Sequence, residues 1–127
     1  MNFFFVSPKI LQMPEKIKQA LNHKAKIKEI EKLGQVIKDV DVIYMTRVQK
    51  ERFADQARYE RLKNSYVLTT DLMKKAKKNA IVMHPLPRVG EISEEIDSDP
   101  RALYLTEQMR NGLYIRMALL AAVLGKA

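Results

Sequence analysis

The segment His84-Pro85-Leu86-Pro87-Arg88 contains the residues best suited to binding chemistry, and it directly follows the apolar residues 80–83. Two prolines within four residues remove two backbone N–H donors, so the carbonyls of Pro85 and Leu86 are predicted to stay out of a regular ladder and to accept a ligand. Free carbonyls suit an amide or an ammonium group. Arg88 suits a carboxylate or phosphate, with an ion pair inside the protein as an equal alternative. A lone His84 is more often structural than catalytic.

A second polar segment, Arg47-Val48-Gln49, follows the apolar residues 41–46. The planar guanidinium of Arg47 can fork onto a carboxylate or phosphate. In an open parallel sheet, ligands bind at the carboxyl ends of the strands, where both polar segments would lie. Together the two segments predict a site for a small zwitterionic or anionic substrate.

The elements that must position these segments alternate between strands and helices. Apolar, β-branched runs predict strands, and apolar residues at helical spacing predict helices. Residues 47–64 predict a loop that leads into a helix. This alternation predicts an α/β fold, an open parallel sheet with helices on both faces, as in Rossmann-like domains. The predicted strands are residues 2–7, 27–30, 41–46, 66–68 and 80–83, and the other helices are 14–22, 33–40 and, after a cap at Thr69 or Thr70, 70–79.

The chain is predicted to end in a long apolar helix over residues 113–124, where Arg116 is the sole charged residue. A helix that is apolar almost all round must be covered on most sides, and a sheet covers only one face. We expect a protein surface beyond these 127 residues to cover the rest. The alternative is a central helix in a small core.

Composition narrows the function classes. The 127 residues, 46% of them hydrophobic, predict one folded domain. With no cysteine and only His23 and His84, a thiol nucleophile, a zinc–thiolate site and a histidine-rich metal site are excluded, and no metal or cofactor is predicted. Without a basic region, the apolar start is not a signal peptide, and no run reaches the roughly 20 residues of a membrane span, so a cytoplasmic protein without membrane contact is expected.

The charged segments of the sequence do not by themselves indicate a binding partner. The net charge of +8 favours acidic partners, but residues 74–78, four lysines around Ala76, are predicted to be a solvated helix face. They lack the interleaved aromatic residues of a nucleic-acid surface, so no nucleic-acid partner is expected. The acidic residues between 91 and 99 do not match a calcium loop and are predicted to form a solvated loop.

Four segments together resemble the aspartate-binding half of aspartate carbamoyltransferases, and the resemblance extends over essentially all 127 residues. Ornithine carbamoyltransferases have a cysteine in place of Pro85 and a Ser-Met-Gly loop, which are both absent here, so aspartate is the better substrate assignment. The four segments are residues 44–53 (YMTRVQKERF), 82–89 (VMHPLPRV), 97–102 (DSDPRA) and 111–120 (NGLYIRMALL).

The resemblance implies that residues 1–127 form an aspartate-binding domain. It would serve an enzyme that transfers the carbamoyl group of carbamoyl phosphate to the amine of L-aspartate in pyrimidine synthesis. Arg47 and Gln49 would hold the aspartate carboxylates, and the carbonyls of Pro85 and Leu86 would hold the carbamoyl amide and align the amine. Residues in supporting positions would be Glu51, Arg52, His84 and Arg88, and the Leu86–Pro87 peptide would be cis.

The same resemblance implies what lies outside this sequence. The phosphate-binding Ser-Thr-Arg-Thr segment and the other catalytic groups belong to a carbamoyl-phosphate domain, so no complete catalytic set is present in these residues. The full enzyme would be a homo-oligomer, a trimer. The alternative from another function class is a half-enzyme without activity that serves as a binding or assembly module.

Overall fold

The computed structural model describes residues 1–22 and 25–126, without the side chains of Asn22 and Arg52, so His23 lies outside it. Strands and helices both occur along the whole chain, but the predicted alternation is not strict, because two strands are joined by a 3₁₀ turn alone and two α-helices follow each other without a strand between them. The strands are β1 (Asn2–Val6), β2 (Lys26–Ile30), β3 (Val42–Tyr44) and β4 (Ile81–Met83); the α-helices are α1 (Glu15–Asn22), α2 (Gln56–Leu62), α3 (Thr70–Lys75) and α4 (Glu107–Val123); the 3₁₀ turns are η1 (Lys9–Leu11), η2 (Leu33–Gln35), η3 (Lys50–Arg52), η4 (Glu94–Ser98) and η5 (Leu103–Leu105).

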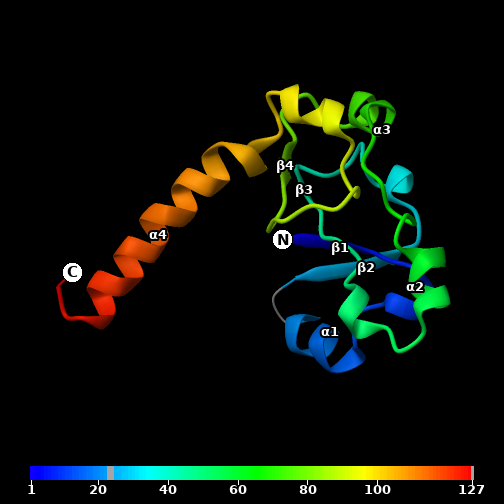
Figure 1. Ribbon diagram of the computed structural model, residues 1–127, viewed down its shortest axis with the longest axis horizontal. Coiled ribbons are helices and arrows are strands. Elements are labelled where there is room, and N and C mark those ends of the chain that lie inside the picture. The colour runs from blue at the N-terminus through cyan, green and yellow to red at the C-terminus, as the bar shows by residue number, and fades with distance from the viewer. Residues whose placement is uncertain (23–24, 127) are drawn as a thin grey trace.

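The strands are parallel and form two pairs, β1 with β2 and β3 with β4 (Figure 1). Ile43 lies opposite Val82 in the second pair, and the Met45 N–H extends this ladder by donating to the Met83 carbonyl at 2.9 Å. The predicted strand at 66–68 is reduced to one parallel bridge, between Leu68 and Ile92. The α/β class is confirmed, but the predicted open sheet is divided into two pairs in the described residues.

The hydrophobic core lies around β3 and β4. Its largest members are less than 2% exposed; Val82 comes from β4, and the others come from the loops and 3₁₀ turns around the two strands. β1 is more open, since Phe3 is 36% exposed and no residue of this strand is fully buried. The fully enclosed side chains are Tyr104, Ile37, Leu68, Ile92, Ile96, His84 and Val82.

Two predicted helices are shorter than expected. The helix predicted over 33–40 is a 3₁₀ turn, η2, because Gly34 and the β-branched residues after it have low helix propensity. α3 begins as predicted, with the Thr69 hydroxyl accepting from the Leu72 N–H at 3.4 Å. It ends at Lys75, because the backbone of Ala76 leaves the helical conformation with ψ 158°.

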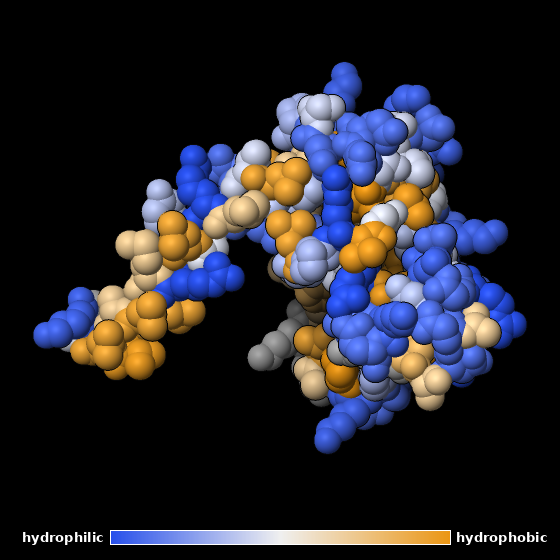
Figure 2. All heavy atoms as spheres, in the orientation of Figure 1, coloured by the Kyte–Doolittle hydropathy of each residue, from blue (hydrophilic) through white to orange (hydrophobic). Residues whose placement is uncertain are grey.

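Helix α4 projects away from the rest of the fold (Figure 1). It has no buried residue, and apolar side chains such as Leu113, Ile115 and Leu120 are more than half exposed. Figure 2 shows apolar residues along this helix, densest toward its C-terminal end. An exposed apolar surface that extends along a helix favours contact with another protein surface. In the described part of the chain, no helix has both the length and the hydropathy that crossing a membrane requires.

Candidate functional site

The parallel pairing of β3 and β4 brings the two polar segments of the sequence together. Tyr44 lies opposite Met83 at the ends of these strands, so the residues that follow leave the sheet at the same edge. There they border a cleft of about 1070 Å³ that extends toward β1. Its polar lining includes Thr46, Arg47, Gln49 and Arg58, its loop lining includes His84, Pro85, Leu86 and Pro87, and its apolar lining includes Phe4, Val6, Met13, Val36 and Phe53.

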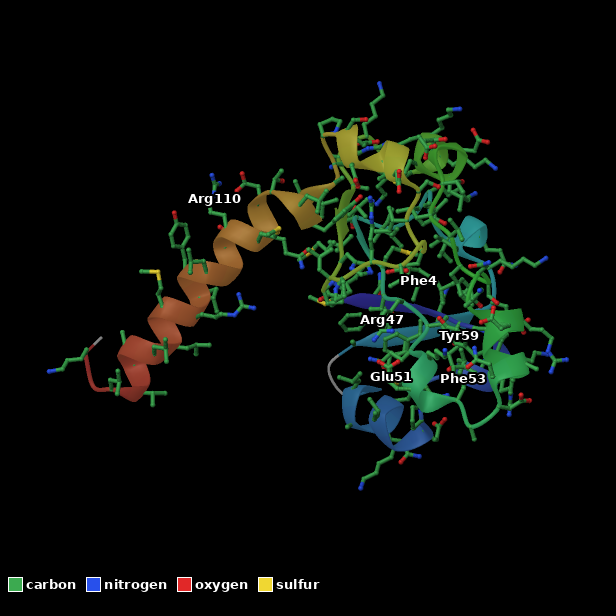
Figure 3. The ribbon with its side chains drawn as sticks, viewed as in Figure 1. Phe4, Arg47, Glu51, Phe53, Tyr59 and Arg110 are labelled. Atoms are coloured by element: carbon green, nitrogen blue, oxygen red, sulfur yellow. The ribbon has the colours of Figure 1, made fainter. Side chains whose placement is uncertain are left out.

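Arg47 provides a cation at this cleft. Its side chain is 32% exposed, and its guanidinium forks onto Glu51, with Nη2 2.5 Å from Oε1 and Nη1 3.4 Å from Oε2. Figure 3 shows the two residues side by side below β1. The carboxylate lies one turn further along the chain, in η3, and orients the guanidinium without enclosing it. Arg47 therefore keeps the planar charge that a carboxylate would need, whereas the Arg52 side chain lies outside the described residues.

The loop after β4 contributes backbone carbonyls. Among the described residues, no hydrogen bond ends on the carbonyl oxygens of Pro85 or Leu86. The Leu86–Pro87 peptide is cis, which confirms the expectation from the resemblance, and Leu86 has φ 50°. A bulky residue in this left-handed region is uncommon, so surrounding contacts must hold the loop in its shape. Both carbonyls are available as acceptors beside the cleft.

His84 is buried, with 1% of its surface exposed, although it borders the cleft. Gln108 binds its backbone in both directions: the His84 N–H donates to Oε1 at 3.1 Å, and the His84 carbonyl accepts from Nε2 at 2.7 Å. The ring contacts the Tyr104 ring edge-on, with centroids 6.5 Å apart. These contacts attach the start of the loop to α4 and η5.

Arg88 points away from the cleft toward the acidic segment. Its guanidinium forks onto Asp97, with Nη2 2.6 Å from Oδ2, and Asp97 also accepts from the Tyr104 hydroxyl at 2.5 Å. The Tyr104 hydroxyl and Arg88 together lower the pKa of Asp97 below its usual range. Glu91 is only 5% exposed, so the prediction of a solvated acidic loop is wrong at this residue, whereas Glu94, Glu95 and Asp97 are exposed as predicted. Asp97 accepts from the Arg88 guanidinium, and Glu91 accepts from the Val89 N–H.

Replacing Tyr104 with phenylalanine tests this network. Tyr104→Phe removes a partly buried hydrogen bond to a carboxylate, and we expect about 1.5 kcal/mol less free energy of unfolding at pH 7. Burial also raises the pKa of Tyr104 to about 12. The wild-type stability conferred by this group is complete below pH about 10, where an unfolded tyrosine titrates, and is lost as the pH rises toward 12.

Urea denaturation at several pH values measures both effects. The alkaline loss of stability should be steeper in the wild type than in Tyr104→Phe. Tyr114→Phe, at a tyrosine 56% exposed on α4, is the matched control and should leave both quantities unchanged. Coinciding curves for Tyr104→Phe and wild type would contradict the assignment.

The sequence did not single out the residues that close the far side of the cleft. Arg58 of α2 brings a second guanidinium to the lining, and Phe53 packs edge-on against Tyr59 with ring centroids 5.8 Å apart (Figure 3). Asp55 starts α2 by accepting from the Ala57 N–H at 2.9 Å, and this local cap signal could have placed Arg58 on the first turns of that helix. The direction of the Arg58 side chain toward the cleft depends on packing between distant segments of the chain.

Comparisons with known proteins agree with this geometry. The family model of the aspartate/ornithine carbamoyltransferase Asp/Orn binding domain matches residues 1–123. The aspartate carbamoyltransferase catalytic subunit of Finegoldia magna is 53% identical over 124 residues, which are 97% of this chain and 40% of that protein. The chain thus spans about two fifths of the length of such relatives.

Solved structures give the same result. The catalytic subunit of M. jannaschii aspartate transcarbamoylase superposes with a TM-score of 0.85 at 39% identity, over 99% of this chain and 42% of that one. Aspartate transcarbamoylase from Trypanosoma cruzi, in complex with carbamoyl phosphate and aspartate, gives a TM-score of 0.83 at 40% identity, over 94% of this chain and 40% of that one. With its parallel α/β fold and a family match from residue 1 to residue 123, the chain belongs to the aspartate/ornithine carbamoyltransferase family, in its Asp/Orn binding domain.

Proposed function

We propose that residues 1–127 form the aspartate-binding domain of an aspartate carbamoyltransferase. The observation that carries this proposal is the cleft that joins Arg47 and Gln49 to the loop of Pro85 and Leu86. One side of the cleft offers a guanidinium and the other offers carbonyl acceptors. This pairing suits a molecule with a carboxylate at one end and N–H groups at the other, as in aspartate and its carbamoyl derivative.

The charge of Arg47 supports aspartate over ornithine. The side chain of aspartate ends in a carboxylate that a guanidinium attracts, whereas that of ornithine ends in an ammonium that it repels. Arg58 adds a second positive charge to the lining. Gln49 assists with its amide, and Glu51 keeps the Arg47 guanidinium oriented toward the substrate.

In the proposed reaction the amine of L-aspartate attacks the carbamoyl carbon of carbamoyl phosphate. A C–N bond forms, the C–O bond to phosphate breaks, and the amine gives up a proton. The carbonyls of Pro85 and Leu86 hold the carbamoyl N–H groups and align the amine, so these residues contribute by positioning and not as a covalent nucleophile. The Trypanosoma cruzi relative was solved with both substrates bound, which supports extending them to this chain.

The phosphate side of the reaction is assigned to a carbamoyl-phosphate domain outside these residues. We infer that this domain covers the exposed apolar face of α4, and that the whole enzyme is a cytoplasmic homo-oligomer, a trimer. The relatives extend well beyond the matched length, which is consistent with such a domain.

Calorimetry on the 127-residue chain tests the substrate class. N-carbamoyl-aspartate and succinate should both bind, and citrulline, the carbamoyl derivative of ornithine, should bind more weakly because its side chain has no carboxylate for Arg47. Tighter binding of citrulline would shift the proposal to the ornithine branch. No binding of any of the three ligands would overturn the aspartate-binding assignment for these residues.

A further inference from the structure

The buried His84 ring is held by the loop that follows it. Its Nδ1 accepts the Leu86 N–H at 2.8 Å, so this nitrogen has no proton, and in the neutral ring the proton resides on Nε2. Nε2 lies 2.6 Å from Oε1 of Glu91, so the two atoms face each other as a buried pair, and neither makes a hydrogen bond of regular geometry in the described part of the chain. The carboxylate is therefore the group that favours this tautomer.

Glu91 can face His84 because the chain turns back on itself. Gly90 has φ 103°, a conformation that other residues rarely adopt. The second carboxylate oxygen of Glu91, Oε2, accepts the Val89 N–H at 2.9 Å. A continuous set of contacts thus runs from Leu86 through the His84 ring and Glu91 to Val89.

The hydrogen bond from Leu86 has a consequence for the neighbouring carbonyl. The Leu86 N–H and the Pro85 C=O belong to the same trans peptide unit and point in opposite directions. Because the N–H points inward to the buried ring, the Pro85 carbonyl points away from it, and exposed Pro85 borders the cleft. The ring nitrogen therefore sets the direction of this acceptor.

We propose that His84, as the Nε2-protonated tautomer held by Glu91, is a positioning residue that directs the Pro85 carbonyl toward the N–H groups of a bound ligand. The inference rests on the proposed function for the identity of that ligand. The position of the ring proton is independent of it. Leu86 has a left-handed backbone, which is uncommon for a bulky residue, so a fixed partner for its N–H helps to hold the loop in this shape.

Two ligands and two variants test the positioning role by calorimetry. N-carbamoyl-aspartate has N–H groups for the Pro85 carbonyl, whereas succinate has none. His84→Leu, which removes the acceptor, should weaken N-carbamoyl-aspartate binding by about 3- to 10-fold and leave succinate binding unchanged. His84→Asn should restore most of the affinity, because an asparagine oxygen accepts readily from the N–H two residues ahead.

The other outcomes separate this inference from the proposed function. Equal losses for both ligands in His84→Leu, or no loss for either, would overturn the positioning role. If the unaltered chain binds neither ligand, the proposed function fails. Long-range ¹H–¹⁵N spectra of the unaltered chain place the ring proton whatever the ligands do, even if His84→Leu does not fold: a proton on Nε2 supports the inference, and one on Nδ1 would overturn it.

Discussion

Expressed on its own, a polypeptide of these 127 residues is expected to form no detectable N-carbamoyl-aspartate from carbamoyl phosphate and L-aspartate. Holding two reactants in register accounts for about 7–11 kcal/mol of a barrier, or roughly 10⁵- to 10⁸-fold in rate. The cleft provides the proposed aspartate side of that arrangement. The Finegoldia magna relative is far longer, since the matched residues are 40% of it. A colorimetric assay for carbamoyl-aspartate measures the result.

Adding the partner half distinguishes the two function classes. A polypeptide with the Ser-Thr-Arg-Thr segment of a carbamoyl-phosphate domain should restore turnover and should cover α4, which hydrogen exchange would report as new protection of that helix. Turnover by the 127 residues alone would contradict the proposal that the reaction needs a separate carbamoyl-phosphate domain. A stable complex without turnover would instead support an assembly module.

Replacing Arg47 with alanine is expected to have the largest effect on ligand affinity of any single change in the cleft. The Arg47 guanidinium lines the cleft next to the loop of Pro85 and Leu86, and Glu51 orients it. Losing a charged hydrogen-bonding partner costs about 1.5–3 kcal/mol, which corresponds to roughly 10- to 150-fold weaker binding. Calorimetry with succinate isolates this effect, because succinate makes no N–H contact with the Pro85 carbonyl.

Arg110→Ala provides a matched control for this substitution. Arg110 is also paired with a glutamate one turn away, Glu107, but it lies on α4, far from Arg47 (Figure 3). The Arg110→Ala variant should bind succinate with the same affinity as the wild type. Thermal unfolding of both variants checks that neither substitution disturbs the fold, since exposed pairs of this kind contribute little to stability. Unchanged succinate affinity in Arg47→Ala would remove Arg47 from the site.

Much of the local structure is predictable because its signals are local. The apolar runs of β1, β3 and β4 and the cap at Thr69 depend on neighbouring residues, and the structure has them where the pattern predicts them. Helix lengths were predicted less well than strand positions, since α4 begins at Glu107, earlier than predicted, and α3 ends at Lys75. Propensity is a weak signal when a segment is short, so residues 33–40 form a single turn and α3 ends early.

The candidate site likewise has one part that the sequence predicts and one part that it does not. Positions directly after parallel strands must meet at one sheet edge, so the sequence places Arg47 beside the Pro85 loop without knowledge of the packing. The partners of the acidic residues could not be predicted by that reasoning. Glu91 reaches His84 across a turn, and Asp97 meets Arg88 and Tyr104 from a different element. Amino-acid composition does not distinguish a solvated acidic loop from a network of ion pairs and hydrogen bonds.

By itself, then, the sequence determined the α/β class, the strand ends and the residues that stand there, because each depends on chain neighbours or on the parallel order of strands. Only the tertiary structure decided that Arg88 pairs with Asp97 and that Glu91 is buried against His84. The reason is that burial and ion pairing are set by which distant surfaces meet. Those contacts leave no periodic pattern in the chain.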